Sequence, residues 1–148
     1  FTAAMALDSG TISMAGGYDA SKPIRVARFI IRDFHAKNRW LSLPEIILHS
    51  SNIGAAKMAV DVGGPSQRAY LSKFGLLKPA GLELPEVGAP LMPSVWRPIN
   101  TMTISYGHGI SVSPLQVLTG VTALVNGGTG VSLGHVTFAD LGEIGTSI

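Results

Sequence analysis

The stretch that decides the fold is Ser42–Val62, which reads SLPEIILHSSNIGAAKMAVDV. Ser42 and Glu45 have the spacing of a capping box, and Pro44 is tolerated in a first helical turn, so a short helix is expected at 43–49. His49-Ser50-Ser51-Asn52 then interrupts the pattern, and an almost wholly apolar helix is expected at 52–62. A helix that is apolar on every side is normally a buried one.

Further helices are expected on either side of this stretch. Phe1 to Leu7 has helical character and is followed by Asp8-Ser9-Gly10, which predicts a helix at 2–8. Pro65 begins a helix at 65–74, and Ser113 with Gln116 forms a second capping box that begins a helix at 113–126. In that last helix the expected inward stripe is apolar and consists of Leu115, Leu118, Val121 and Val125.

The remaining segments predict little regular structure. Residues 16–33 combine a Gly-Gly pair, Pro23 and alternating apolar residues, which predicts a short two-stranded or extended segment. Residues 78–100 hold five of the nine prolines, so a long irregular loop is expected there.

Composition limits the class of protein. The chain has 148 residues, enough for one domain with a real core. Only 14% of residues are charged and the mean hydropathy is +0.35, yet no apolar run reaches the roughly 18 residues that a membrane helix needs. This combination is typical of the interior of a larger soluble domain. The eleven Lys and Arg read as scattered, which argues against a nucleic-acid partner.

Several kinds of chemistry lack their motif. There is no Cys, and the four His do not have zinc-site spacing, so no metal or other cofactor is expected. Asp33, His35 and Ser50 could be imagined as a catalytic triad, but no Gly-x-Ser-x-Gly turn accompanies them. Taken alone, Ser50-Ser51-Asn52 is most simply a helix N-cap, although its hydroxyl and carboxamide could also point into one cleft.

The order of several segments resembles the class B penicillin-binding proteins, most closely the division-specific peptidoglycan D,D-transpeptidases of proteobacteria. Phe1-Thr2-Ala3-Ala4 is similar to the sequence that follows that family's Ser-x-x-Lys motif, and Arg32-Asp33-Phe34-His35 is similar to its Arg/His-Asp-x-His segment. Ser50-Ser51-Asn52 matches its Ser-x-Asn motif. Two later matches complete the order, Gly81-Leu82-Glu83-Leu84-Pro85 and the segment from Tyr106 to Gln116 with Asn126-Gly127-Gly128.

This resemblance implies the α/β penicillin-binding transpeptidase (β-lactamase-like) fold, of which this chain is mainly the helical part with little sheet. Residues 1–130 would be a central part of the domain, and residues 131–148 an unplaced tail. The implied reaction cross-links stem peptides through a serine acyl-enzyme. Ser50 would relay a proton, Asn52 would hold the acyl carbonyl, and Ser51 would cap or pack beside the substrate. For His49, a cation at the helix C-terminus is preferred to a catalytic role, because the helix dipole favours positive charge there.

The resemblance also implies partners and a location. Peptidoglycan stem peptides, β-lactam antibiotics and division proteins are the expected partners, at the periplasmic face of the bacterial inner membrane, with an anchor outside these residues. Two alternatives stay open at this point. One is a non-catalytic binding module with the same fold, and the other is an unrelated small helical protein.

Two family motifs, Ser-x-x-Lys and Lys-Thr/Ser-Gly, do not occur in family-matching positions in the 148 residues. Because the attacking serine belongs to the first of them, we expect a labelled penicillin not to attach covalently to this chain on its own. Denaturing gel fluorescence and intact mass measure the adduct. A stable Ser-linked adduct on the 148-residue chain would contradict this expectation.

Overall fold

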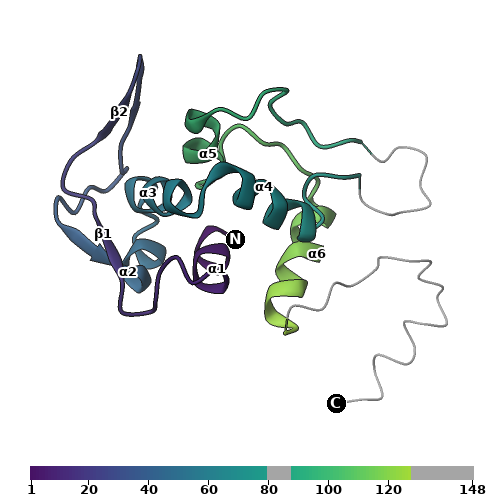
Figure 1. Ribbon diagram of the computed structural model, residues 1–148, viewed down its shortest axis with the longest axis horizontal. Coiled ribbons are helices and arrows are strands. Elements are labelled where there is room, and N and C mark those ends of the chain that lie inside the picture. The colour runs from purple at the N-terminus through teal and green to yellow at the C-terminus, as the bar shows by residue number, and fades with distance from the viewer. Residues whose placement is uncertain (80–87, 128–148) are drawn as a thin grey trace. The chain divides into compact units, whose positions relative to one another are not determined.

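The computed structural model describes residues 1–79 and 88–127 (Figure 1). These residues fall into two compact units. The first contains Phe1–Leu71 and Leu91–Ser111, and the second contains the described residues among Ser72–Pro90 and from Val112 onwards. The predicted Gly81–Pro85 loop, Gly128 and the 131–148 tail lie outside the described residues.

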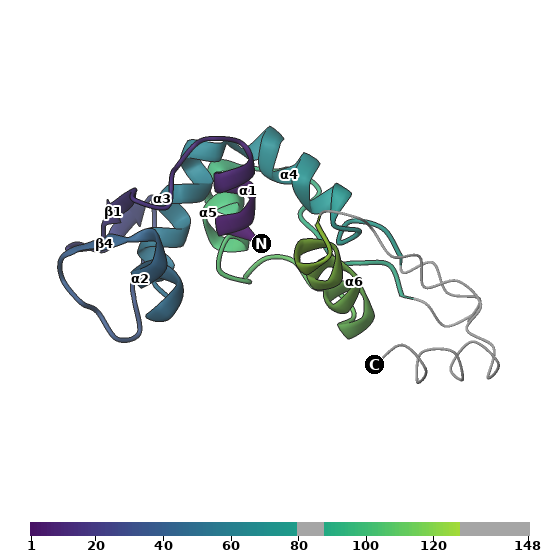
Figure 2. The same cartoon turned by 90° about the horizontal axis from the view of Figure 1, so that it is seen from below.

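The first unit is built around helix α3 (Asn52–Val62), which packs against α1 (Thr2–Asp8), α5 (Pro98–Ile104) and strand β1 (Gly17–Asp19). Figure 2 shows α1 and α5 beside α3. Ile53, Ala56, Met58 and Ala59 of α3 are each at most 2% exposed. The prediction that this apolar helix is buried is therefore confirmed for most of its surface, while Lys57, Val60 and Asp61 reach towards solvent.

Helix α2 (Leu43–Leu48) lies directly before α3, and Gly54 allows the two helices to approach closely. A Cβ atom added at Gly54 would lie 2.7 Å from Cγ1 of Ile46, a residue that is itself buried. A side chain at this position would have to displace Ile46 from the core, because interiors are packed to nearly crystalline density.

Two small antiparallel sheets accompany the helices. Strand β1 pairs with β4 (Trp40–Ser42), so that Gly17 lies opposite Ser42, and β2 (Ile24–Val26) pairs with β3 (Phe29–Ile31) in a hairpin. Gly17 has to lack a side chain, because a Cβ there would lie 2.2 Å from the carbonyl oxygen of Leu41. The expected short two-stranded segment is confirmed in β2 and β3.

Helix α4 (Gly64–Lys73) begins in the first unit and its last two residues belong to the second. Its buried Gln67 donates from Nε2 to the carbonyl oxygen of Thr101 at 3.0 Å and accepts a hydrogen bond from Nε1 of Trp96. These bonds attach the 91–104 segment to α4.

The prediction of an irregular loop through residue 100 is wrong at its end, because α5 begins at Pro98. Proline is tolerated in the first turn of a helix, where its missing N–H has no intrahelical partner. The side-chain oxygen Oδ1 of Asn100 accepts a hydrogen bond from the N–H of Arg97 at 2.9 Å and completes the turn. The many prolines before Pro98 had led to the expectation of a continuous loop, so this short helix was not predicted.

In the second unit, helix α6 (Pro114–Val125) has the predicted capping box of Ser113 and Gln116. The expected inward stripe is wrong, however. Leu118, Val121 and Val125 are 56%, 42% and 80% exposed in the described structure, whereas Gln116, Gly120 and Ala123 are buried. Gln116 takes this face because its side-chain amide donates to the carbonyl oxygens of Gly75 and Lys78.

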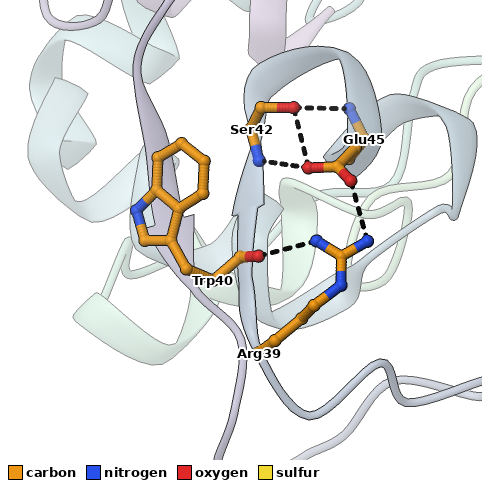
Figure 3. A network of polar contacts seen from close by, with 4 residues as sticks. All are labelled: Arg39, Trp40, Ser42 and Glu45. Carbon is orange, nitrogen blue, oxygen red and sulfur yellow. Dashed lines mark hydrogen bonds and ion pairs between the residues drawn. The ribbon is translucent and has the colours of Figure 1, made fainter.

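The capping box at the start of α2 is reinforced by an ion pair (Figure 3). Glu45 accepts hydrogen bonds from the N–H and the hydroxyl of Ser42, both at 2.9 Å, and its other carboxylate oxygen pairs with Arg39 at 2.7 Å. Arg39 also donates to the carbonyl oxygen of Trp40. The Arg39 guanidinium first, and then the Ser42 donors, lower the pKa of Glu45 from 4.5 to about 2.

This network makes stability depend on acid. Because the folded state holds the Glu45 carboxylate below its ordinary pKa, its contribution is complete above pH 4.5 and is lost as the pH falls towards 2. We therefore expect the melting temperature of the native protein to exceed that of Glu45→Gln at pH 6, and the difference to shrink between pH 4.5 and 2. Thermal melts followed by circular dichroism measure it. In the control variant Arg39→Gln the pKa of Glu45 should lie nearer its ordinary value, so the acid-dependent loss of stability should be smaller and should end at a higher pH. A native-minus-variant difference that is independent of pH would rule out this role of Glu45.

Candidate active site

The junction between α2 and α3 positions the three residues of the Ser-x-Asn motif. At the end of α2 the N–H of Ser50 donates to the carbonyl oxygen of Ile47 at 3.2 Å, and the N–H of Ser51 donates to that of Ile46 at 2.9 Å. This pair of bonds is the Schellman arrangement, in which the residue after the C-cap takes a left-handed conformation. His49 is the C-cap, at the helix C-terminus where a cation was expected.

Ser50 occupies the left-handed position, with a φ of 50°. Glycine is the usual residue there, because a Cβ atom makes the left-handed conformation less favourable. Ser50 is exposed, and its hydroxyl makes no hydrogen bond with another described residue. A strained residue with an unused hydroxyl is the kind of feature that concentrates at functional sites.

Ser51 is a structural residue at the start of α3. It is 3% exposed, its hydroxyl oxygen accepts a hydrogen bond from the N–H of Gly54 at 3.0 Å, and the same hydroxyl donates to Oδ2 of Asp33 at 2.8 Å. The prediction that Ser51 caps the helix is confirmed. A contact of Ser51 with substrate stays a prediction.

Asp33 joins the hairpin side of the molecule to α3. Besides accepting from Ser51 with one carboxylate oxygen, it accepts from the N–H of Ile53 with the other, at 2.9 Å. A carboxylate at a helix N-terminus satisfies unpaired N–H groups and interacts favourably with the helix dipole. The imagined triad is not formed, because Asp33 bonds α3 instead of His35.

Asn52 is held by the same segment. Its side-chain Nδ2 donates one hydrogen bond to the carbonyl oxygen of Arg32 at 2.9 Å. An amide nitrogen carries two hydrogens, so a second donor and the carbonyl oxygen of Asn52 make no further hydrogen bond with the described residues. The hydrogen bond to Arg32 thus orients the side chain, and its second amide hydrogen and its carbonyl oxygen are able to bind a ligand.

The three motif residues line one cavity of about 300 Å³ in the first unit. Its other walls are the start of α1 (1–3), Ile46 and Ile47 of α2, Ala55 and Met58 of α3, and Ser105 with Tyr106 after α5. The hydroxyl of Thr2 donates to the carbonyl oxygen of Ser105 at 2.8 Å and so joins two of these walls. A cavity of this size, lined by apolar side chains together with a few polar groups, is typical of a small-molecule site.

The match to known proteins covers almost the whole chain. The family model described as the penicillin-binding protein transpeptidase domain matches residues 1–137. The chain belongs to this family. The resemblance found in the motifs is therefore confirmed, and the alternative of an unrelated small helical protein is excluded.

Relatives in this transpeptidase family include the probable peptidoglycan D,D-transpeptidase FtsI of Caulobacter vibrioides, which is 41% identical over 86% of this chain and 22% of its own length. Peptidoglycan D,D-transpeptidase FtsI of Escherichia coli is 33% identical over 64% of the chain and 16% of its own. This chain thus spans about a fifth of the length of these relatives.

Solved structures confirm the fold. A peptidoglycan glycosyltransferase from Burkholderia ambifaria matches with a TM-score of 0.83 and 29% identity, over 90% of this chain and 43% of that one. The TP domain of penicillin-binding protein 3 from Burkholderia pseudomallei matches with a TM-score of 0.77 and 27% identity, over 84% and 38%. The expected transpeptidase fold, represented here mainly by its helical part, is confirmed.

Sequence reasoning placed Ser50, Ser51 and Asn52 in the site but gave no site role to Asp33, Thr2, Ser105 or Tyr106. Asp33 lies 18 residues before Ser51, so no local pattern shows that its carboxylate caps α3. In the described ranges, no cluster of three or more His, Cys, Asp and Glu could hold a metal ion. Within the same ranges, no helix has the length and apolarity needed to cross a bilayer.

Removing the Asp33 carboxylate should loosen the site. Asp33→Ala leaves the Ser51 hydroxyl and the Ile53 N–H without their acceptor, so we expect the free energy of unfolding to fall by about 2 kcal/mol. Urea denaturation measures the change. Asp19→Ala is a matched control, because the carboxylate of Asp19, at the exposed end of β1, is hydrogen-bonded to nearby Ser21 and does not cap a helix. Equal effects of the two substitutions would contradict the special role of Asp33.

Proposed function

We propose that this chain supplies one wall of the active site of a serine-type peptidoglycan D,D-transpeptidase, and that residues 1–130 are the central part of its domain. The observation that carries the proposal is the cavity in which the Ser50 hydroxyl and the Asn52 carboxamide meet the start of α1. In the proposed enzyme, the Ser-x-x-Lys motif precedes α1 and therefore lies at this cavity. The Lys-Thr/Ser-Gly strand is proposed to follow later in the full protein.

The proposed reaction transfers an acyl group in two steps. The serine hydroxyl of Ser-x-x-Lys attacks the carbonyl of the D-Ala-D-Ala bond, the C–N bond breaks, and the leaving amine takes a proton. A second amine from a neighbouring stem peptide then attacks the ester and releases the serine. A β-lactam would enter the first step and remain attached.

Ser50 is proposed to carry the proton between the lysine and the leaving amine. Two features support this role. The hydroxyl of Ser50 has no hydrogen-bond partner among the described residues, and its backbone holds an unfavourable left-handed conformation. General acid–base catalysis of this type contributes about 10²- to 10⁴-fold. The hydroxyl both accepts and donates, as a relay requires.

Asn52 is proposed to donate its second amide hydrogen to the carbonyl of the bound acyl group. Its hydrogen bond to the carbonyl oxygen of Arg32 keeps the carboxamide from rotating, which reduces the entropy lost when substrate binds. Ser51 would contribute by capping α3 and by forming part of the wall. The single hydroxyl proton of Ser51 is donated to Asp33, so Ser51 could donate to substrate only by giving up Asp33.

The biological setting follows from the relatives and is proposed with the function. The substrate would be peptidoglycan stem peptides, β-lactams would be inhibitors, and division proteins would be partners. The domain would lie at the periplasmic face of the bacterial inner membrane. The same fold without an active serine would leave a non-catalytic binding module as the second possibility.

Substitutions of Ser50 separate catalysis from stability. In the full-length protein, we expect Ser50→Gly to lower the rate of acylation by a fluorescent penicillin by about 10²- to 10⁴-fold. The same substitution should leave the free energy of unfolding unchanged or raise it by up to about 1 kcal/mol, because glycine relieves the left-handed strain. Stopped-flow fluorescence and urea denaturation measure the two quantities.

The exposed Ser66 of α4, which does not line the cavity, provides the control substitution Ser66→Ala. It should acylate at the native rate. If Ser50→Gly also acylates at that rate, the proton relay is wrong. If the native full-length protein does not acylate at all and its gene lacks Ser-x-x-Lys before Phe1, the non-catalytic binding module is the better interpretation.

A further inference from the structure

The positive charge of the chain is concentrated in one place. Residues 20–40 hold six of the eleven Lys and Arg but only one of the nine Asp and Glu, so this stretch has a net charge of +5 while the rest of the chain has −3. The impression of evenly scattered cations is therefore wrong. Most of this stretch is the β2–β3 hairpin and the residues that follow it. Figure 1 shows the hairpin, labelled β2, at the upper left.

Three arginines of this region, Arg25 in β2, Arg28 in the turn and Arg32 after β3, form what we term the arginine hairpin (residues 24–32). All three are exposed, and none makes an ion pair with a described residue. In contrast, Arg39 is paired with Glu45. In the register of the hairpin Arg25 lies opposite Ile30, so the three arginines do not face one another; they lie along one nine-residue segment in which no carboxylate forms an ion pair with them.

The one carboxylate within this stretch does not neutralise the arginines. Both oxygens of Asp33 are occupied at the start of α3, by Ser51 and by the N–H of Ile53. Phe29 and Phe34 are 47% and 91% exposed beside the arginines, and the Arg28 guanidinium lies 5.3 Å from the centre of the Phe29 ring. This surface offers charge and apolar area together.

The arginine hairpin is continuous with the proposed active site. The carbonyl oxygen of Arg32 accepts the hydrogen bond of Asn52, and Asn52 lines the cavity. A ligand held by Asn52 would therefore bind next to the backbone of Arg32. A ligand longer than the cavity could bind both.

We infer that the arginine hairpin binds internal carboxylates of a peptidoglycan stem peptide whose end occupies the cavity. This inference rests on the proposed function and extends it from the reacting bond to the rest of the substrate. Guanidinium groups form paired hydrogen bonds with carboxylates, which suits a flexible acidic peptide. A small β-lactam would bind in the cavity and would not reach Arg25 or Arg28.

The test compares two matched double variants of the full-length protein. Arg25→Gln/Arg28→Gln removes two hairpin cations, and Lys78→Gln/Arg97→Gln removes two exposed cations elsewhere. We expect the hairpin variant to bind an acetylated stem pentapeptide about 3- to 10-fold more weakly by isothermal titration calorimetry, since exposed ion pairs contribute modestly. Its acylation by fluorescent penicillin should stay within about twofold of native, and the control variant should match native in both measurements.

A second probe identifies the group that is bound. The same pentapeptide with its internal carboxylates amidated and its terminal carboxylate free should bind the native protein and the hairpin variant equally. Arg25→Lys/Arg28→Lys, which keeps the charge, should recover part of the affinity. Thermal melts show whether each variant is folded. If the glutamine variant is unfolded, the lysine variant is used for the binding measurements instead.

Each opposite result has a distinct meaning. Equal affinity of native and hairpin variant for the acidic pentapeptide, with normal penicillin acylation, would overturn this inference and leave the proposed function intact. Loss of binding to vesicles of an anionic phospholipid, with unchanged peptide affinity, would also overturn it and assign the hairpin to a membrane surface. A native protein that neither acylates nor binds the peptide would contradict the proposed function itself.

Discussion

The Asp33 carboxylate is the interaction on which the site depends. It accepts one hydrogen bond from Ser51 and another from the N–H of Ile53, and so joins the chain after β3 to the start of α3. Without it, the first turn of α3 would lose acceptors for groups that the helix itself cannot satisfy. The position of Asn52, and of the carbonyl oxygen of Arg32 that holds it, follows from this junction.

The junction between α2 and α3 combines a rigidly packed backbone with a strained conformation at Ser50. Helix α3 is packed by α1, α5 and β1, and α2 is held close to it at Gly54, so the backbone between them has little freedom. Surroundings of this rigidity can keep Ser50 in a left-handed conformation that a serine would otherwise avoid. The same rigidity keeps the unused hydroxyl of Ser50 at a constant place in the lining of the cavity.

The first unit has two kinds of charged group on its surface, those that are paired with one another and those that are not. Glu45, Arg39 and Ser42 are paired with one another and stabilise the start of α2 (Figure 3). Arg25, Arg28 and Arg32 have no ionic partner among the described residues, and the acid nearest to them in sequence is engaged elsewhere. Paired charges of the first kind belong to folding, whereas the unpaired arginines are available to an anionic ligand.

Local sequence was sufficient for the features that depend on neighbours in the chain. Both capping boxes, the breaks between helices, the buried α3 and the motif Ser50-Ser51-Asn52 follow from residues no more than four positions apart, because helix starts and apolar periodicity are short-range effects. Tertiary structure decided the rest. Packing alone brings together residues that are 18 to 103 positions apart in the chain. It decides the cap of α3 by Asp33, the hydrogen bond from Asn52 to the carbonyl oxygen of Arg32, the exposed stripe of α6, and the cavity that α1 and Ser50 line together.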